Sequence, residues 1–541
     1  MRGGGWKGKA TGSMVVGSLV VFAATWIPGM DAEGAEEKSK VPTVYELKGA
    51  PREESASPKT PVHVPREGSF EVNIEEAILL ALENNRSLRV EQFNPPIQGT
   101  FEDQAQAVFD PVFDGRADYS RNKELFRSRT IPGGYDDTEN LGAARVGVSK
   151  FFATGTTVDI NVSGERSWSE LYSDQYASRL GFSVTQALLR GAGTEVNLAT
   201  LQQAQLATRI SEYEFRGFAE ALVATVEDSY WDYALAGRQI EIFEESLKVA
   251  EQQLREIEVM ISVGKLAETE ATAAQAEIAV QRQGLIAAKG TFETTRLRLL
   301  RLLNPQGPDL WDRTVKLRQE PRLPEAVLDP VKIHVDIALK LRPELNQAKL
   351  GVQSNNLEVV KTKNGLLPRM DFFISLGKTG YADSFGSSVS NFTDDYYDVL
   401  AGVTFQYPFR NRDARARHQR STLTRDQSLE AVGNLEQLIE VEVRAAYIEV
   451  TTAREQILAS RASRKLQEEK LRIETEKIRV GRSTSFLVSQ AQRDLLSSQI
   501  TEIRAVADYL KALVALYRLE GSLLERRGID APGRDAVALT P

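Results

Sequence analysis

The feature that most constrains this chain is an internal repeat marked by two glycines. Val263-Gly264-Lys265 and Val480-Gly481-Arg482 stand 217 residues apart, and a helical pattern precedes and follows each of them. Two further pairs keep the same offset: Val226 with Val443, and Tyr230 with Tyr447. Glycine between two helices is typical of a C-cap and a tight reversal, because it adopts the left-handed conformation at little steric cost. The sequence therefore predicts a tandem duplication in which each copy contains one long α-hairpin.

Long helices flank each predicted turn. No proline occurs from Val196 to Ile261, and two apolar series repeat there every seven residues, as in a coiled-coil seam. These series are Val226, Tyr233, Ile240, Leu247, Leu254 and Ile261, and Ala236, Phe243, Ala250 and Ile257. At 1.5 Å per residue this helix is roughly 100 Å long. The returning helices are expected over residues 268–303 and 485–521.

Before each long helix the apolar period changes from 3.6 to 2, which is typical of β-strands. The alternating segments are 109–120, 157–163 and 179–185 in the first copy, with a weaker one around 146–148, and 370–376 and 397–407 in the second. These segments are 7 to 12 residues long, apart from the weaker one, and a tilted strand needs about 9–11 residues to cross a bilayer. A half-buried sheet in a soluble protein gives the same alternation.

The N-terminus is expected to be a cleaved secretory signal over residues 1–35. Arg2, Lys7 and Lys9 precede an apolar run from Met14 to Ile27 that is too short for a membrane helix. An amphipathic or disordered tail is the alternative. No later stretch is apolar enough for a membrane helix, and an exported chain without one is either soluble or a β-barrel. We therefore expect a barrel.

Composition argues against several other functions. The net charge is −8 with 26% charged residues, which does not favour nucleic acid as a partner. Three histidines and no cysteine leave little for nucleophilic or metal chemistry, so we expect no enzyme, no cofactor and no metal site. Gly191-Ala192-Gly193 ends in Val196 where a dinucleotide fingerprint needs glycine, and it is better interpreted as a strand-to-helix turn.

Paired motifs mark equivalent places in the two copies. Opening helices carry Ala81-Leu82-Glu83-Asn84-Asn85 and Arg342-Pro343-Glu344-Leu345, and strand entries carry Phe109-Asp110-Pro111 and Leu366-Leu367-Pro368. Strand exits carry Gln186-Ala187-Leu188-Leu189-Arg190-Gly191 and Gln406-Tyr407-Pro408-Phe409. Over residues 71–521 these motifs and their order resemble the TolC family of outer-membrane efflux proteins, although Ala187 stands where that family usually has proline.

The resemblance implies a mixed α/β membrane protein built as a homotrimer. A transmembrane β-barrel shared by three chains would lie in outer-membrane lipid, and a twelve-helix α-helical barrel would continue it across the periplasm. The strands of one chain are too few to close a barrel alone, which agrees with a barrel shared between chains. The hairpin tips, Val263-Gly264-Lys265 and Val480-Gly481-Arg482, would meet the periplasmic adaptor (membrane fusion) protein of an inner-membrane pump of RND or ABC type.

On this interpretation the protein is a passive exit duct for efflux or for type I secretion, with energy supplied by the pump. The alternative, from another class, is an exported coiled-coil scaffold or adhesin with a soluble β domain. Detergent-dependent extraction from outer-membrane fractions distinguishes the two.

Candidate residues of a pore constriction follow each turn. They are Glu268 and Glu270 in the first copy, and Ser485, Leu487 and Gln490 in the second. The resemblance implies acidic residues in the second copy, but Leu487 and Gln490 stand where aspartate is expected. Either three copies of Glu270 line the mouth and Leu487 seals it, or Glu268 and Glu270 are solvated residues of the outer face.

The sequence thus divides into a signal peptide (1–35), a disordered proline-rich linker (36–70), a first efflux repeat (71–305), a connector around Trp311 (306–330), a second repeat (331–521) and a disordered tail (522–541). The family has four strands in each subunit, whereas the first copy here has an additional hairpin that turns at Ala153-Thr154-Gly155-Thr156. Six strands per subunit remain open. We favour four, with this hairpin outside the wall, because a wider barrel should mismatch twelve helices.

Overall fold

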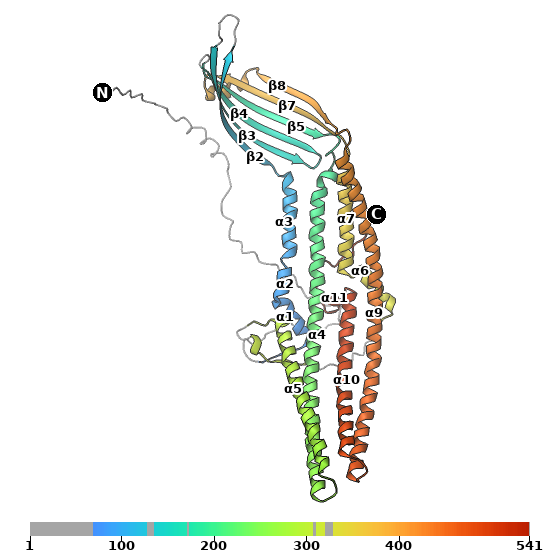
Figure 1. Cartoon of the computed structure of the whole chain (residues 1–541). Helices are drawn as coiled ribbons and strands as arrows, with labels where there is room; N and C mark the ends of the chain where they lie inside the picture. Colours follow the sequence, from blue (N-terminus) through green and yellow to red (C-terminus); the bar gives the residue numbers. More distant parts are fainter. Residues whose placement is uncertain (1–68, 127–134, 170–172, 307–309, 320–327, 540–541) are drawn as a thin grey trace, which may run out of the picture. The chain divides into compact units, whose positions relative to one another are not determined.

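A computed structural model of the chain describes residues 69–126, 135–169, 173–306, 310–319 and 328–539 (Figure 1). These residues belong to one compact unit, Tyr45–Pro541. The expected signal peptide (1–35) and nearly all of the expected linker (36–70) lie outside the described residues.

Six strands form one antiparallel sheet in the order β2-β3-β4-β5-β7-β8. Their bounds are β2 Val112–Phe126, β3 Tyr135–Phe152, β4 Thr156–Trp168, β5 Gln175–Ala187, β7 Arg369–Ala382 and β8 Tyr397–Gln406. The expectation that the extra hairpin lies apart from the other four strands is wrong, because β3 and β4 are hydrogen-bonded between β2 and β5 in one sheet. Between β7 and β8, α8 (Phe385–Ser390) and η3 (Asn391–Thr393) pack back onto the sheet.

Two long hairpins extend from the sheet. The first is α4 (Thr194–Ser262) with α5 (Thr269–Leu303), and the second is α9 (Arg412–Arg479) with α10 (Ser485–Leu519). The sequence predicts the bounds of α4, α5 and α10 to within a few residues, and for α9 it predicts the turn at Gly481 that ends the helix. In Figure 1 the turns of both hairpins lie at the ends of α4 and α9 farthest from the sheet.

Shorter helices precede the strands in each copy. They are α1 (Ile74–Asn84), α2 (Arg86–Glu91), α3 (Asn94–Gln106) and η1 (Ala107–Phe109), and then α6 (Val331–Leu341) and α7 (Pro343–Asn364). Asn73 and Glu76 form a reciprocal capping box that starts α1. Pro95 and Pro96 lie in the first turn of α3, where their missing amide hydrogens leave no helical bond unmade.

The core lies along the middle of α4, where α1 and α5 pack on it and the connector folds against it. In the connector, β6 (Val315–Leu317) pairs in parallel with β1 (Phe70–Val72), which continues into α1. The buried hydroxyl of Tyr233 donates to the carbonyl of Val315 at 2.7 Å, so α4 holds this small sheet. The connector does not pack around Trp311, which is 52% exposed within η2 (Leu310–Asp312).

The expectation of a disordered tail after residue 521 is wrong for the described residues 522–539. The helix α11 (Leu523–Arg526) buries Leu523 and Leu524, and Val537 donates its backbone N–H to the buried Asn346 on α7. Charged residues surround these few apolar ones in the sequence, so no periodic pattern marks the segment. Its order comes from burial against α4 and α7 and from ion pairs.

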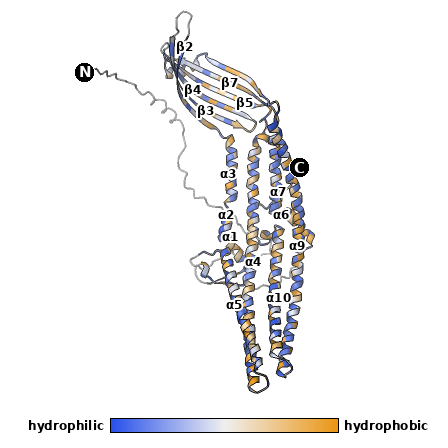
Figure 2. Ribbon diagram, viewed as in Figure 1, coloured by the Kyte–Doolittle hydropathy of each residue, from blue (hydrophilic) through white to orange (hydrophobic). Residues whose placement is uncertain are grey.

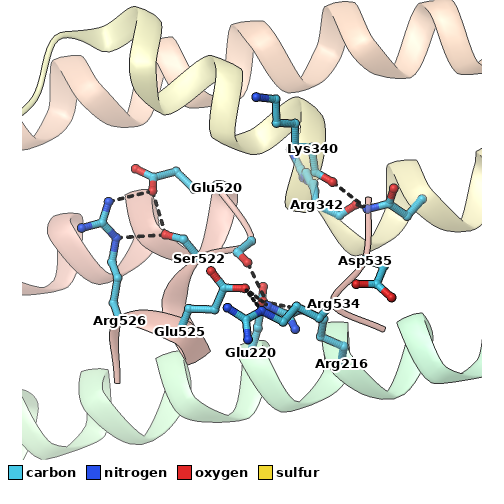
Figure 3. Close-up of polar contacts among 12 residues, drawn as sticks. Arg216, Glu220, Lys340, Arg342, Glu520, Ser522, Glu525, Arg526, Arg534 and Asp535 are labelled. Carbon is cyan, nitrogen blue, oxygen red and sulfur yellow. Dashed lines mark hydrogen bonds and ion pairs between the residues drawn. The ribbon is translucent and has the colours of Figure 1, made fainter. Parts of the chain in front are cut away.

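Figure 3 shows part of these ion pairs. Arg216 on α4 lies 3.4 Å from Glu220 and 3.5 Å from Glu525 of the tail, while Arg526 contacts Glu520 at 3.2 Å. Burial raises the pKa of Glu220 to about 8, although the charge of Arg216 acts in the opposite direction. Burial therefore disfavours the ionised form of the Glu220 carboxyl.

No helix in the described part of the chain combines the length and the apolar character needed to cross a membrane.

Candidate functional site

One face of the sheet is apolar from edge to edge. In register across the six strands lie Phe113, Val148, Ile160, Phe182, Leu376 and Val399. All six side chains are exposed, from 39% to 69% of their surface, so no described part of the chain covers this row. Four residues along the strands, α8 packs on the same face, where the hydroxyls of Ser388 and Ser178 lie 2.6 Å apart. Figure 2 shows hydrophobic residues along the strands. An apolar surface of this size is characteristic of contact with a membrane or another protein.

The opposite face of the same strands is polar. The neighbouring register row is Asp114, Gly147, Asn161, Gly181, Gly377 and Asp398. Arg179 contacts Asp398 at 2.7 Å, and Arg145 contacts Asp159 at 3.2 Å. A Cβ at Gly377 would lie 2.1 Å from a carboxylate oxygen of Asp398, so glycine makes room for this ion pair. The strands therefore separate an apolar side from a charged one, as the sequence alternation predicts.

Both hairpin tips close with the same turn. Gly264 and Gly481 have φ of 73° and 72°, and Lys265 and Arg482 donate their backbone N–H to carbonyls five residues earlier, at 2.8 Å in each turn. This pattern is a Schellman motif, in which a residue other than glycine at the left-handed position is strained. The side chains of Val263 and Val480 are exposed beside these turns, so each tip presents a valine to solvent.

Glu270 joins the two hairpins just behind the tips. Its carboxylate accepts the backbone N–H of Ser485 at 2.8 Å and also the Ser485 hydroxyl. Thr484 holds the N-cap position of α10 without a side-chain cap, so Glu270 caps that helix from the other copy. A carboxylate at a helix N-terminus satisfies an orphan donor and complements the helix dipole.

The structure does not bring the other candidate constriction residues to this contact. Glu268 is the exposed N-cap residue of α5. Leu487 and Gln490 are exposed on α10, whereas Ser485 is buried. Whether Glu270 or Leu487 faces a pore depends on neighbouring copies and stays a prediction.

A second link between the hairpins lies farther from the tips and was not singled out from the sequence. Arg493 on α10 contacts the buried Glu277 on α5 at 2.6 Å. A small cavity of about 20 Å³, lined partly by Ala250, Ile257 and Val488, separates the hairpins here. Arg493 and Glu277 both lie in the runs that follow the turns, but only the packing of α5 on α10 shows that they meet.

No group of three or more histidine, aspartate or glutamate side chains is placed to hold a metal ion within the described ranges.

Comparisons with known proteins agree on one fold. A family model described as outer membrane efflux protein matches residues 77–305 and 335–522. The outer-membrane channel CmeC of Campylobacter jejuni has a TM-score of 0.62 at 15% identity, over 89% of this chain and 95% of that chain. CusC has a TM-score of 0.62 at 17% identity, over 88% of this chain and 99% of that chain. MtrE of Neisseria gonorrhoeae in its open state has a TM-score of 0.59 at 16% identity, over 83% of this chain and 89% of that chain. A comparison with curated proteins gives no match.

Proposed function

The chain belongs to the outer membrane efflux protein family, channel proteins of the outer membrane that extend into the periplasm, and from that premise we propose that three copies assemble into one exit duct. In this proposal the six-stranded sheets of three copies close into a shared barrel in the membrane. The helical hairpins continue it through the periplasm as a tube of twelve helices. The duct is passive and takes its substrates from an inner-membrane pump.

The observation that carries the proposal is the two-faced sheet with free edges. The apolar row from Phe113 to Val399 is exposed on all six strands, and the polar row beside it carries ion pairs. In the described chain β2 and β8 each pair on one side only. Unpaired strand edges are unfavourable in lipid, and closure with the next copy removes them.

The helices also leave apolar surface for a neighbouring copy. Phe93, at the N-cap of α3, and Ile97 and Phe101 within it are exposed at helical spacing, and α9 exposes Leu438 and Val441. Because α3 precedes the edge strand β2 and α9 follows the edge strand β8, closure of the sheet between chains would bring these helices together. Burial of such side chains contributes about 1.5–3 kcal/mol each when it is complete.

The tips are the proposed docking point for a periplasmic adaptor. They lie at the end of a 69-residue helix, roughly 100 Å from the sheet, and each chain has two of them with the same turn geometry. Three copies would present six such turns in a ring, a repeated surface for an adaptor oligomer. The adaptor would connect the duct to a pump of RND or ABC type, in tripartite efflux or in type I secretion.

The contact of Glu270 with Ser485 supports a resting state in which the two hairpins of each chain are held together. Spreading of the tips by the adaptor would break this capping contact and the Arg493–Glu277 pair. Leu487, exposed two residues beyond Ser485, is the proposed apolar seal of the closed mouth.

The test compares adjacent residues on opposite faces of β5. Phe182→Arg places a charge on the apolar face, at an expected cost of about 2–4 kcal/mol near the bilayer midplane. Ser183→Arg is the matched control, because it lies on the polar face opposite Asp159. Outer-membrane fractionation and native mass measurement in detergent should show trimers for the wild type and Ser183→Arg, and loss of membrane insertion for Phe182→Arg. A stable monomeric channel, or equal insertion of both variants, contradicts the proposal.

A further inference from the structure

A cluster of cations lies where the sheet meets the helices. The first turns of α9 carry Arg412, Arg415, Arg417 and Arg420, directly after Arg410. The equivalent start of α4 carries Glu195 and no basic residue until Arg209. Positive charge near a helix N-terminus is unfavourable, because the helix dipole is already positive there. The second copy therefore has a charge arrangement that its own fold does not stabilise.

Part of this cluster lines an open cavity of about 610 Å³. The β8–α9 connection contributes Arg410, Arg412 and Arg417, the end of α7 contributes Lys361, and the β5–α4 connection contributes Arg190. Two acids also line the cavity, and each already has a cationic partner in it: Glu358 with Lys361 at 3.1 Å, and Asp413 with Arg417 at 3.0 Å.

Three guanidinium groups remain. Arg190, Arg410 and Arg412 are exposed, and in the described part of the chain their side chains have no hydrogen bond or ion pair. Arg190 and Arg410 lie four residues after Gln186 and Gln406, where the two strand exits begin, and each precedes a residue with positive φ, Gly191 or Asn411. The two exits thus turn alike and bring their arginines to one cavity.

Exposed apolar side chains lie in the same connections between strands and helices as these arginines. The apolar face of β8 continues past the strand end through Tyr407 to Phe409, which is 99% exposed and directly precedes Arg410. Leu188 and Leu367, in the connections on the neighbouring strands, are also exposed. A set of unpaired cations at the rim of an exposed apolar face matches the two parts of a phospholipid, an anionic phosphate and its acyl chains.

We propose that Arg190, Arg410 and Arg412 bind the phosphate of a phospholipid in the membrane leaflet that faces the helices. The acyl chains lie against the apolar face of the strands, and the phosphate enters the cavity. Guanidinium groups suit this ligand because they donate two parallel hydrogen bonds to phosphate oxygens. The inference rests on the proposed placement of the sheet in the membrane.

Native mass spectrometry of the full chain in detergent tests the site with phosphatidylglycerol as the probe. The variant is Arg190→Gln with Arg410→Gln and Arg412→Gln. The matched control is Arg444→Gln with Arg461→Gln and Arg472→Gln, which removes the same charge from exposed positions farther along α9. We expect binding to weaken about tenfold or more in the variant, and to stay at the wild-type level in the control.

Two further probes distinguish the sources of the phosphate. Diacylglycerol with the same acyl chains should bind much more weakly than phosphatidylglycerol. Inorganic phosphate at millimolar concentration should not displace the bound lipid. Equal lipid binding by the arginine variant, or binding of inorganic phosphate in place of the lipid, overturns the proposal. Failure of the proposed function would appear separately in insertion and trimer formation, because lipid binding is measured in detergent.

Discussion

The two long hairpins share their dimensions and their turns, yet their surroundings differ. Helices α4 and α9 are 69 and 68 residues long, and α5 and α10 are both 35. Twenty residues of α4 are buried, among them three glutamate and arginine side chains, whereas nine residues of α9 are buried and none is charged. Repeated sequence therefore sets helix length and turn, while position in the fold decides which helix becomes the core.

Truncating the same tyrosine in each copy should give the largest difference. Tyr230 on α4 is fully buried and its hydroxyl lies 3.4 Å from the carbonyl of Val72, whereas Tyr447 on α9 is only partly buried. Tyr230→Ala should lower the free energy of unfolding by about 3–5 kcal/mol, as for other buried aromatic residues, and Tyr447→Ala should lower it clearly less. Thermal unfolding of the purified protein in detergent measures both, and equal losses would contradict the unequal burial.

Changing pH should affect the first copy through Glu220, whose counterpart in the second copy is Gln437. The folded pKa of Glu220 is about 8, above the unfolded value near 4.5, so the folded state keeps a proton that the unfolded state releases. Stability should therefore fall, on the order of a few kcal/mol, as pH rises from about 4.5 to 8.

The groups that face Glu220 are Arg216 on α4, Glu344 on α7 and Glu525 of the tail. Glu220→Gln keeps the neutral form at every pH and gives α4 the residue of α9. Its melting temperature should depend less on pH than that of the wild type. A variant with the wild-type pH profile would show that another group, such as the buried Glu227, causes the change.

The two tips should respond alike to substitution of their glycines. Gly264→Val and Gly481→Val each force a β-branched residue into the left-handed conformation, at about 1–2 kcal/mol, although open space surrounds both positions. The strain is local to the turns, so trimers should still insert while export fails. Antibiotic or dye export in cells measures this. Normal export by both variants would refute the role of the tips, and failure of one alone would make them unequal.

The smallest effect should come from the link between the copies. Glu270→Gln keeps the shape but weakens the cap on α10 by about 1 kcal/mol, and it loosens one hairpin against the other. Single-channel recording should then show a higher resting conductance, as should Leu487→Ser. If the resting conductance of Glu270→Gln stays at the wild-type level and its cation selectivity falls instead, Glu270 lines the pore and its contact with Ser485 is incidental.

Local pattern predicted much of this fold from sequence. The 217-residue offset, the proline-free runs and the alternating segments place both hairpins, both turns and all six strands. What pattern could not predict depends on contacts between distant segments. The tail is ordered by Asn346 and Glu227, which lie far away in the sequence, and Arg527 contacts Glu227 at 2.5 Å. The carboxylate of Glu270 likewise finds Ser485 only because the two hairpins pack together.

The six-stranded sheet also bears on the width of the proposed tube. Strands about 4.8 Å apart and tilted by about 45° each cover roughly 7 Å of circumference, so six strands cover an arc of about 40 Å. Four helices packed about 9–10 Å apart cover nearly the same arc. Four is the number of helices that one chain would contribute to a ring of twelve. Four strands would cover only about 27 Å by the same geometry. With six strands, the arc of one chain would be the same above and below the cation cluster, and the proposed conduit would pass from lipid to periplasm without a taper.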